Sequence, residues 1–449
     1  MITDKKVALF FLGSIMILLI FFVGIDSVYG SFIFVVLLLG VYVVMMEVEV
    51  DEKKLIGKKD LKRRVSTRLS VIKQKDDNFS LPIFLDYAQM LFLKTYYSCP
   101  DKEKVSKIEP FFSYDLKKLK PTVYSQVVVE KAEITDIKST GGKCNIAVNF
   151  SAYFAAKYKQ DMFHCRAEEE WLFSRQANAV SSVPNGFGVL RCSKCGRYLD
   201  FDNPGKCTHC GAGQTFENGQ WVVSDIKRKQ IKRLFPEKEL ITYRPEKGTS
   251  DPSLITDNIK TKEQDFFKIQ NYKLISFRDF ENRIAKEYFV KIYNNFSSGQ
   301  WNSTRHLIYE NTWQNIKFML SEYHRYGYKR IIDNLEVTKT ETVNYEKDNF
   351  YQTLTVRIFA ECYDYVVNYE TGIIGGSNRQ KRYFSQYWTF LSCIGFTGKI
   401  TDTELCPSCG KKVGDIDNSG ICPYCMNRVN DGNFSWVLYS ITEDEDYFG

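Results

Sequence analysis

Histidine is scarce in this chain of 449 residues, and the short motifs that usually carry catalysis are missing. The four histidines are His164, His209, His306 and His324. None of them belongs to an H-E-x-x-H pattern or to a nucleophile–base signature. The sequence Thr-Gly-Gly-Lys-Cys at 140–144 suggests a phosphate loop, but Ile137 stands where the first glycine is needed and Cys144 stands where Ser or Thr should follow the lysine. We therefore predict no catalytic residue and no enzymatic activity.

Excess charge of either sign is also missing outside one segment. The net charge is +7, but residues 53–75 hold ten Lys or Arg against Asp60 alone, which gives this segment +9 and leaves −2 for the rest of the chain. The near-neutral remainder does not favour a nucleic-acid footprint on the folded part. We expect no nucleic-acid partner.

The cysteines do not suggest a disulfide framework. Eight of the thirteen fall into four C-x-x-C pairs, and an odd number is left over, namely Cys99, Cys144, Cys165, Cys362 and Cys393. Paired knuckles with an odd remainder favour reduced thiols and metal, which indicates a cytosolic environment.

The C-x-x-C pairs have the spacing of two zinc ribbons, within 190–213 and 404–428. Zinc takes four tetrahedral thiolates from two such knuckles, and Gly211 and Gly410 directly after knuckles suit the tight turns that this requires. Paired disulfides, a redox C-x-x-C and an iron–sulfur cluster are the alternatives. We predict two structural zinc ions per chain, with the ligands Cys192, Cys195, Cys207, Cys210, Cys406, Cys409, Cys422 and Cys425.

Two uncharged, mostly apolar stretches of nineteen residues each, at 7–25 and 28–46, predict a transmembrane helical hairpin within 1–50. Lys5 and Lys6 precede the hairpin and the +9 segment follows it, so both flanks should be cytoplasmic. The alternative is that the first stretch is a cleaved signal peptide. We predict a multi-pass protein of the inner cell membrane, with both termini and the soluble domains in the cytoplasm.

The basic segment at 51–78 would then meet the anionic inner leaflet of the bilayer, which attracts each nearby basic residue by about 1 kcal/mol. The alternative is a topology determinant with no further role. The residues expected at the membrane surface are Lys53, Lys54, Lys58, Lys59, Lys62, Arg63 and Arg64.

The soluble part repeats itself. A Trp precedes each ribbon and another follows it, and the distance from first ribbon cysteine to final Trp is 29 residues in one copy and 30 in the other. The tryptophans concerned are Trp171 and Trp221 in copy one and Trp388 and Trp436 in copy two. We predict a first domain at 79–232, a linker at 233–275 and a second domain at 276–449.

Each copy opens with a helix and continues with strands. Phe84, Tyr87, Leu91 and related positions make an apolar stripe at helical spacing, and strands are expected near 127–137, 143–158 and 164–175 before a ribbon and a last strand. In copy two the corresponding strands are expected near 331–343, 351–367 and 381–393. Helices followed by an antiparallel meander predict an α+β fold in which the helices pack on one face of a curved sheet.

Copy two resembles a known family. Its opening helix, Trp301, the strand at 331–337, the strand at 360–365 and Trp388-x-Phe390 resemble the C-terminal domain of the mitochondrial Tim-translocase motor adaptor, of the nuclear transport factor 2-like superfamily. Copy one matches less well. The resemblance implies two nuclear transport factor 2-like domains with inserted ribbons, and scaffolding rather than catalysis.

Three functions follow as hypotheses. The first is a non-enzymatic, membrane-anchored adaptor for a protein partner of unknown identity, in protein translocation or membrane-protein assembly. The second is a small-molecule or lipid pocket, or a cryptic enzyme, centred on Asp364 and Tyr365, against the simpler interpretation of a surface Asp and a Tyr with a satisfied hydroxyl. The third is nucleic-acid binding through the ribbons.

Overall fold

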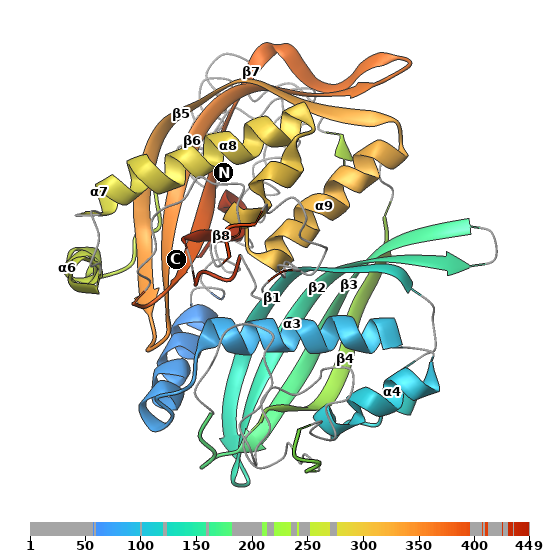
Figure 1. Cartoon of the computed structure of the whole chain (residues 1–449), viewed down its shortest axis with the longest axis vertical. Helices are drawn as coiled ribbons and strands as arrows, with labels where there is room; N and C mark the ends of the chain where they lie inside the picture. The colour runs from blue at the N-terminus through green and yellow to red at the C-terminus, as the bar shows by residue number, and fades with distance from the viewer. Residues whose placement is uncertain are drawn as a thin grey trace, which may run out of the picture.

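The chain forms two α+β units, seen in a computed structural model (Figure 1). The structure describes residues 57, 60–98, 101–119, 124–158, 161–181, 209–212, 220–234, 240–241, 252–269, 276–395, 406, 409–411, 424, 430–433 and 435–448.

The first unit places helices before a four-stranded antiparallel sheet of order β1-β2-β3-β4. A helix over residues 60–75 comes first. The elements after it are α3 (Leu81–Ser98), α4 (Lys102–Ile108), 3-10 turns at Glu109–Phe111 and Leu116–Lys118, β1 (Tyr124–Thr140), β2 (Lys143–Tyr158), β3 (Asp161–Gln176) and β4 (Val222–Arg233).

The second unit repeats this arrangement with a sheet of order β5-β6-β7-β8. Its helical part consists of α6 (Ile259–Ile269), α7 (Phe277–Phe280), a π-helical turn (Glu281–Ala285), α8 (Lys286–Ser298), a 3-10 helix (Trp301–Leu307) and α9 (Glu310–Arg325). Its strands are β5 (Tyr328–Lys347), β6 (Tyr351–Asn368), β7 (Gly372–Cys393) and β8 (Val437–Glu443), followed by a 3-10 turn at Asp444–Asp446.

The two units have the same element order, and an equivalent hydrogen bond occurs within each of them. The Tyr87 hydroxyl donates to the carbonyl oxygen of Trp221 at 2.7 Å, and the Tyr288 hydroxyl donates to that of Trp436 at 3.0 Å. In each pair a helix residue fixes the start of the last strand. The same buried contact at matching places explains why the Trp landmarks recur in the sequence.

One helix crosses the sheet in each unit, α3 in the first and α8 in the second (Figure 1). Aromatic side chains fill the space between that helix and the sheet. The ring of Phe92 on α3 lies 4.7 Å from that of Phe150 and 5.2 Å from that of Trp171. The ring of Phe289 on α8 lies 4.8 Å from that of Trp388. The predicted α+β core with helices on one sheet face is therefore present in both units.

The membrane part of the predicted fold class is corrected. No helix among the described residues is both long enough and apolar enough to cross a bilayer. The longest of the named helices, α3, has 18 residues and buries Asp86, Gln89 and Thr95 within the protein, so its length serves packing on a sheet. The stretches at 7–25 and 28–46 lie outside the described residues. The predicted transmembrane hairpin, and with it the multi-pass location in the inner membrane, is withdrawn.

Helix α9 of the second unit covers the open edge of the first sheet (Figure 1). The strand register of β1 shifts between Val129 and Lys131, and the side-chain amides of Asn311 and Asn315 both donate to the Val129 carbonyl oxygen, at 3.1 and 2.8 Å. An edge strand exposes backbone groups that need partners, and here another unit supplies them. The two units are therefore joined at β1 by directed contacts.

Two further contacts cross the junction. The ring of Phe318 on α9 stacks on that of Tyr153 of β2, with centroids 5.2 Å apart. His164 of β3 lies between Arg325 and Glu322 of α9, with its Nδ1 3.2 Å from a Glu322 carboxylate oxygen and its Nε2 in contact with the Arg325 guanidinium. These contacts fix α9 against three strands of the first sheet.

Candidate binding cleft between the two units

Asp364, predicted as the centre of a pocket, belongs to an ion cluster on β6. Its carboxylate accepts hydrogen bonds from Arg330 Nε at 2.9 Å and Nη2 at 2.6 Å, and from Arg382 Nη1 at 2.8 Å. Burial raises the pKa of this carboxyl, but the charges and hydrogen bonds of the two arginines outweigh burial and hold the pKa below its usual value. Neither cavity described below is lined by Asp364 or Tyr365. A carboxylate that is bound by two arginines in this way stabilises the sheet and is poorly placed to bind a ligand.

The predicted zinc ligands are only partly within the described residues. Cys210, Cys406 and Cys409 are described, and the other five lie outside. At the second ribbon the Gly410 N–H donates to the Cys406 carbonyl oxygen at 2.7 Å, with Gly410 at φ +74°, and Gly211 has φ +68°. These are the left-handed turns that a C-x-x-C-Gly knuckle needs. No group of three or more metal-ligating side chains comes together among the described residues. The zinc sites therefore remain a prediction, with which the two glycine turns are consistent.

The basic segment folds onto the protein where it is described. Lys53, Lys54, Lys58 and Lys59 lie outside the described residues, whereas Lys62, Arg63 and Arg64 begin the helix at 60–75 and are exposed. That helix packs Leu69 and Ile72 on the core of the first unit, and Arg68 donates to Asp136 at 2.6 Å. The Lys62 ammonium lies 5.3 Å from the ring centre of Tyr447, near the end of the second unit. The segment therefore contacts both units.

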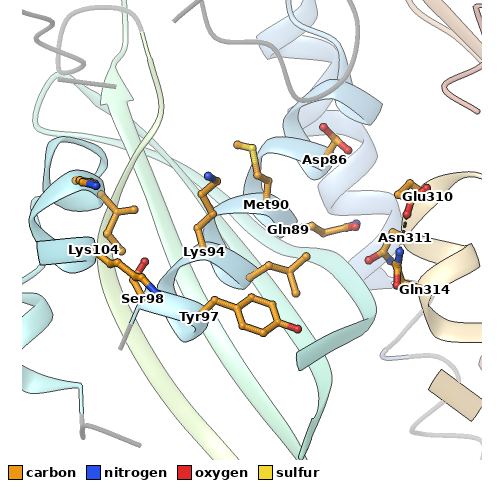
Figure 2. A pocket seen from close by; sticks show the side chains of 13 residues that line it. Asp86, Gln89, Met90, Lys94, Tyr97, Ser98, Lys104, Glu310, Asn311 and Gln314 are labelled. Carbon is orange, nitrogen blue, oxygen red and sulfur yellow. Dashed lines mark hydrogen bonds between the residues drawn. The ribbon is translucent and has the colours of Figure 1, made fainter. Parts of the chain in front are cut away.

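A cleft of about 670 Å³ lies where α3 and α4 of the first unit face α9 of the second (Figure 2). This volume is in the range of sites that bind drug-sized ligands. A smaller cavity of about 220 Å³ lies near Lys62, Tyr351 and Tyr447. The larger cleft exists only because the two units are joined.

The carboxylates in the cleft wall are engaged. Glu310 accepts hydrogen bonds from Arg305 at 3.0 and 3.1 Å, from Gln314 at 2.6 Å and from Asn430 at 3.0 Å. Asp86 accepts a hydrogen bond from the Tyr309 hydroxyl. The lining contains neither histidine nor cysteine. The lining does contain lysines, a tyrosine and a serine, whose amino and hydroxyl groups can donate hydrogen bonds to a ligand.

One polar group in the cleft is unsatisfied. Gln89 of α3 is 9% exposed, and its carbonyl oxygen Oε1 accepts no hydrogen bond from the residues that the structure describes. Its side chain extends toward Asn311 on α9 (Figure 2). A buried acceptor without a donor is costly and needs an explanation, of which an absent ligand is one.

Sequence reasoning missed this cleft. On α3, Asp86, Gln89, Met90, Leu93 and Tyr97 follow one another at helical spacing, on a face other than that of Phe84, Ala88 and Leu91. A helix that carries Met90, Leu93 and Tyr97 away from its core stripe indicates a second contact beyond its own sheet. That pattern could have suggested a partner surface, although not that α9 would form the opposite wall.

No protein-family model and no curated protein matches the chain. Among solved structures, the chain is similar to an "Ntf2 like protein involved in plasmid conjugation", at 9% sequence identity and a TM-score of 0.17, over 79% of this chain and 93% of that chain. A superposition this poor carries no argument about function. The nuclear transport factor 2-like interpretation depends on the architecture observed twice here, and this match does not support the narrower Tim-translocase motor-adaptor family.

Proposed function

We propose that this chain is a non-enzymatic adaptor that binds a protein partner in the cleft between its two units. The observation that carries the proposal is the cleft itself, which lies at a joined interface and whose carboxylates are already engaged. In each unit the sheet face that the helices cover is packed with aromatic side chains. The cleft is the concave surface that is open to a partner.

The junction contacts favour an adaptor that keeps its shape. Asn311 and Asn315 bind the β1 edge through directed hydrogen bonds, and Asn311 also lines the cleft. A partner that contacts α3 and α9 together would therefore meet a surface formed in advance. Such preorganisation lowers the entropy lost on binding.

The proposal is tested by site-specific photo-crosslinking of the full chain in its native cells. A photo-reactive residue at Tyr97 or at Lys104, both exposed at the cleft, should crosslink one reproducible protein neighbour. The same residue at Val180 or Lys143, both exposed and outside the cleft lining, is the control. Absence of a neighbour specific to the cleft positions would contradict the proposal.

We also infer that each ribbon holds one structural zinc ion, on the spacing of its cysteines and on the glycine turns at Gly211 and Gly410. Chain purified from zinc-supplemented cells should contain about two zinc ions, because four thiolates close each tetrahedral site. Cys409→Ser should reduce the content to about one. Elemental analysis by mass spectrometry measures both values. Iron in place of zinc, or unchanged zinc in the variant, would refute the assignment.

A further inference from the structure

We infer that the cleft takes an extended peptide segment in which an acidic side chain stands beside apolar ones. This inference depends on the adaptor proposal and specifies the chemistry of the partner. Three properties of the cleft carry it, namely an unsatisfied acceptor, a set of lysines and an apolar wall.

The unsatisfied acceptor is the Gln89 carbonyl oxygen. The Gln89 side chain is nine-tenths buried in the cleft wall, and no described residue donates to its carbonyl oxygen, so an occupant of the cleft can supply the donor. The backbone N–H of an extended peptide is such a donor. A fatty acid or another lipid tail brings no N–H or O–H to this position, and it would leave Gln89 unsatisfied.

The charge of the cleft favours an acidic ligand. Lys94, Lys104 and Lys107 line the side formed by α3 and α4. Lys104 and Lys107 are exposed, and their ammonium nitrogens lie 3.9 Å from a carboxylate oxygen of Asp101 and 3.4 Å from one of Glu103, respectively. Exposed ion pairs of this kind contribute little to stability. Their ammonium groups can therefore turn to a carboxylate of the ligand.

The opposing carboxylates do not cancel these lysines. Glu310 is paired with the buried guanidinium of Arg305, whereas Asp86 keeps its negative charge, because the Tyr309 hydroxyl that donates to it is neutral. The three lining lysines therefore face the negative charge of one carboxylate, that of Asp86. The charge that remains for a ligand is positive. Electrostatic complementarity of this kind selects partners and speeds association.

The apolar wall consists of Met90, Leu93 and Ile108. Met side chains adapt to different apolar partners. In Figure 2 Lys104 lies at the α4 end, Lys94 lies between it and Met90, and Gln89 points to the α9 side. A peptide crossing from α4 to α9 would therefore place its carboxylate at the lysines and a backbone N–H at Gln89.

The test uses the intact purified chain and a phage-displayed library of random ten-residue peptides. Enriched peptides should combine Asp or Glu with Leu, Ile or Phe, and a fluorescein-labelled selected peptide should bind in fluorescence anisotropy. Lys104→Glu with Lys107→Glu should weaken its binding tenfold or more, at about 1.4 kcal/mol per tenfold. Lys143→Glu, outside the cleft lining, is the matched control and should leave the affinity unchanged.

Gln89→Leu separates binding from folding. It should weaken peptide binding about fivefold to thirtyfold, because the ligand's donor loses its acceptor. The midpoint of urea unfolding should stay the same or rise, because an unsatisfied buried polar group is removed. A merely structural Gln89 would show the reverse, a lower midpoint with unchanged affinity.

Several outcomes would overturn the inference. One is enrichment of basic peptides. Another is a peptide affinity that stays the same in Gln89→Leu and in the double variant of Lys104 and Lys107. Tight binding of a fluorescent fatty acid that requires Lys104 and Lys107 but not Gln89 would assign the cleft to a lipid. If a protein neighbour still crosslinks from Tyr97 in these cases, the adaptor proposal stands and only the peptide chemistry fails. Absence of any crosslinked neighbour removes the adaptor itself.

Discussion

Replacing Asp364 by alanine is expected to lower the free energy of unfolding of the second unit by about 3–5 kcal/mol. The side chain of Asp364 is 10% exposed, and those of Arg382 and Arg330 are 11% and 26% exposed. Without the carboxylate, two guanidinium groups remain close together in a partly desolvated place. Removing one partner of a buried ion cluster leaves charge uncompensated, which is why the loss is large.

Urea unfolding at neutral pH measures this effect. Asp333→Ala on β5 is the matched control, since Asp333 is exposed, and it should change the stability by less than about 0.5 kcal/mol. Combining Asp364→Leu with Arg330→Met and Arg382→Met should recover much of the loss, because apolar groups often replace buried ion clusters without penalty.

The pH dependence has a definite sign. Because the pKa of Asp364 is lowered in the folded chain, its stabilisation is present above the unfolded pKa and is lost as pH falls through the folded one. The peptide affinity of folded Asp364→Ala should be unchanged, since Asp364 does not line the cleft. A stable variant that loses partner binding would instead favour a ligand pocket at Asp364 and Tyr365.

Acidification is expected to weaken the junction between the units through His164. Burial, together with the nearby charge of Arg325, lowers the pKa of His164 to about 4 from an ordinary value of 6.5. The unfolded chain therefore binds this proton more readily than the folded one. Stability from this residue is complete above pH 6.5 and declines as pH falls toward 4, by a total of about 3 kcal/mol.

The groups facing His164 are Arg325 and Glu322 of α9. Burial raises the pKa of Glu322, so the pH dependence of this carboxyl has the opposite sign to that of His164. We therefore expect the effect in the difference between the wild-type chain and His164→Asn, where the contribution of Glu322 largely cancels. Urea unfolding between pH 7 and pH 4.5 should give a steeper loss for the wild type. Parallel pH profiles would show that His164 does not sense protons at the junction.

The repeated fold was predictable because its cause is local and repeated. Tyr87 and Tyr288 lie on apolar helical stripes, and each reaches a Trp that the sequence also marks. A strand boundary was less accurate: β7 begins at Gly372, well before the predicted 381, because a turn at 369–371 joins it closely to β6. Gly376 lies inside this extension with φ +71°, close to the Asp364 backbone, where a side chain could not fit.

The cleft could not be predicted in the same way. It depends on Asn311 and Asn315 meeting the carbonyl oxygen of Val129, more than 180 residues away in the chain. Asparagines on a helix usually face water, and nothing in their spacing indicates a strand edge as partner. For Asp364 the sequence identified the residue but not its role. That role depends on Arg330 and Arg382, which only the folded sheet brings to the carboxylate.

The cleft exists only if the two units are rigidly paired. This pairing is tested most directly by single-molecule energy transfer between dyes on encoded residues at Lys143 of the first unit and Glu370 of the second, both exposed. We expect one narrow efficiency distribution in the wild-type chain at neutral pH. Replacing Asn311 and Asn315 by alanine should broaden it, because the β1 edge loses two hydrogen bonds from α9. A broad or multiple distribution in the wild-type chain would show that the two units are not rigidly paired.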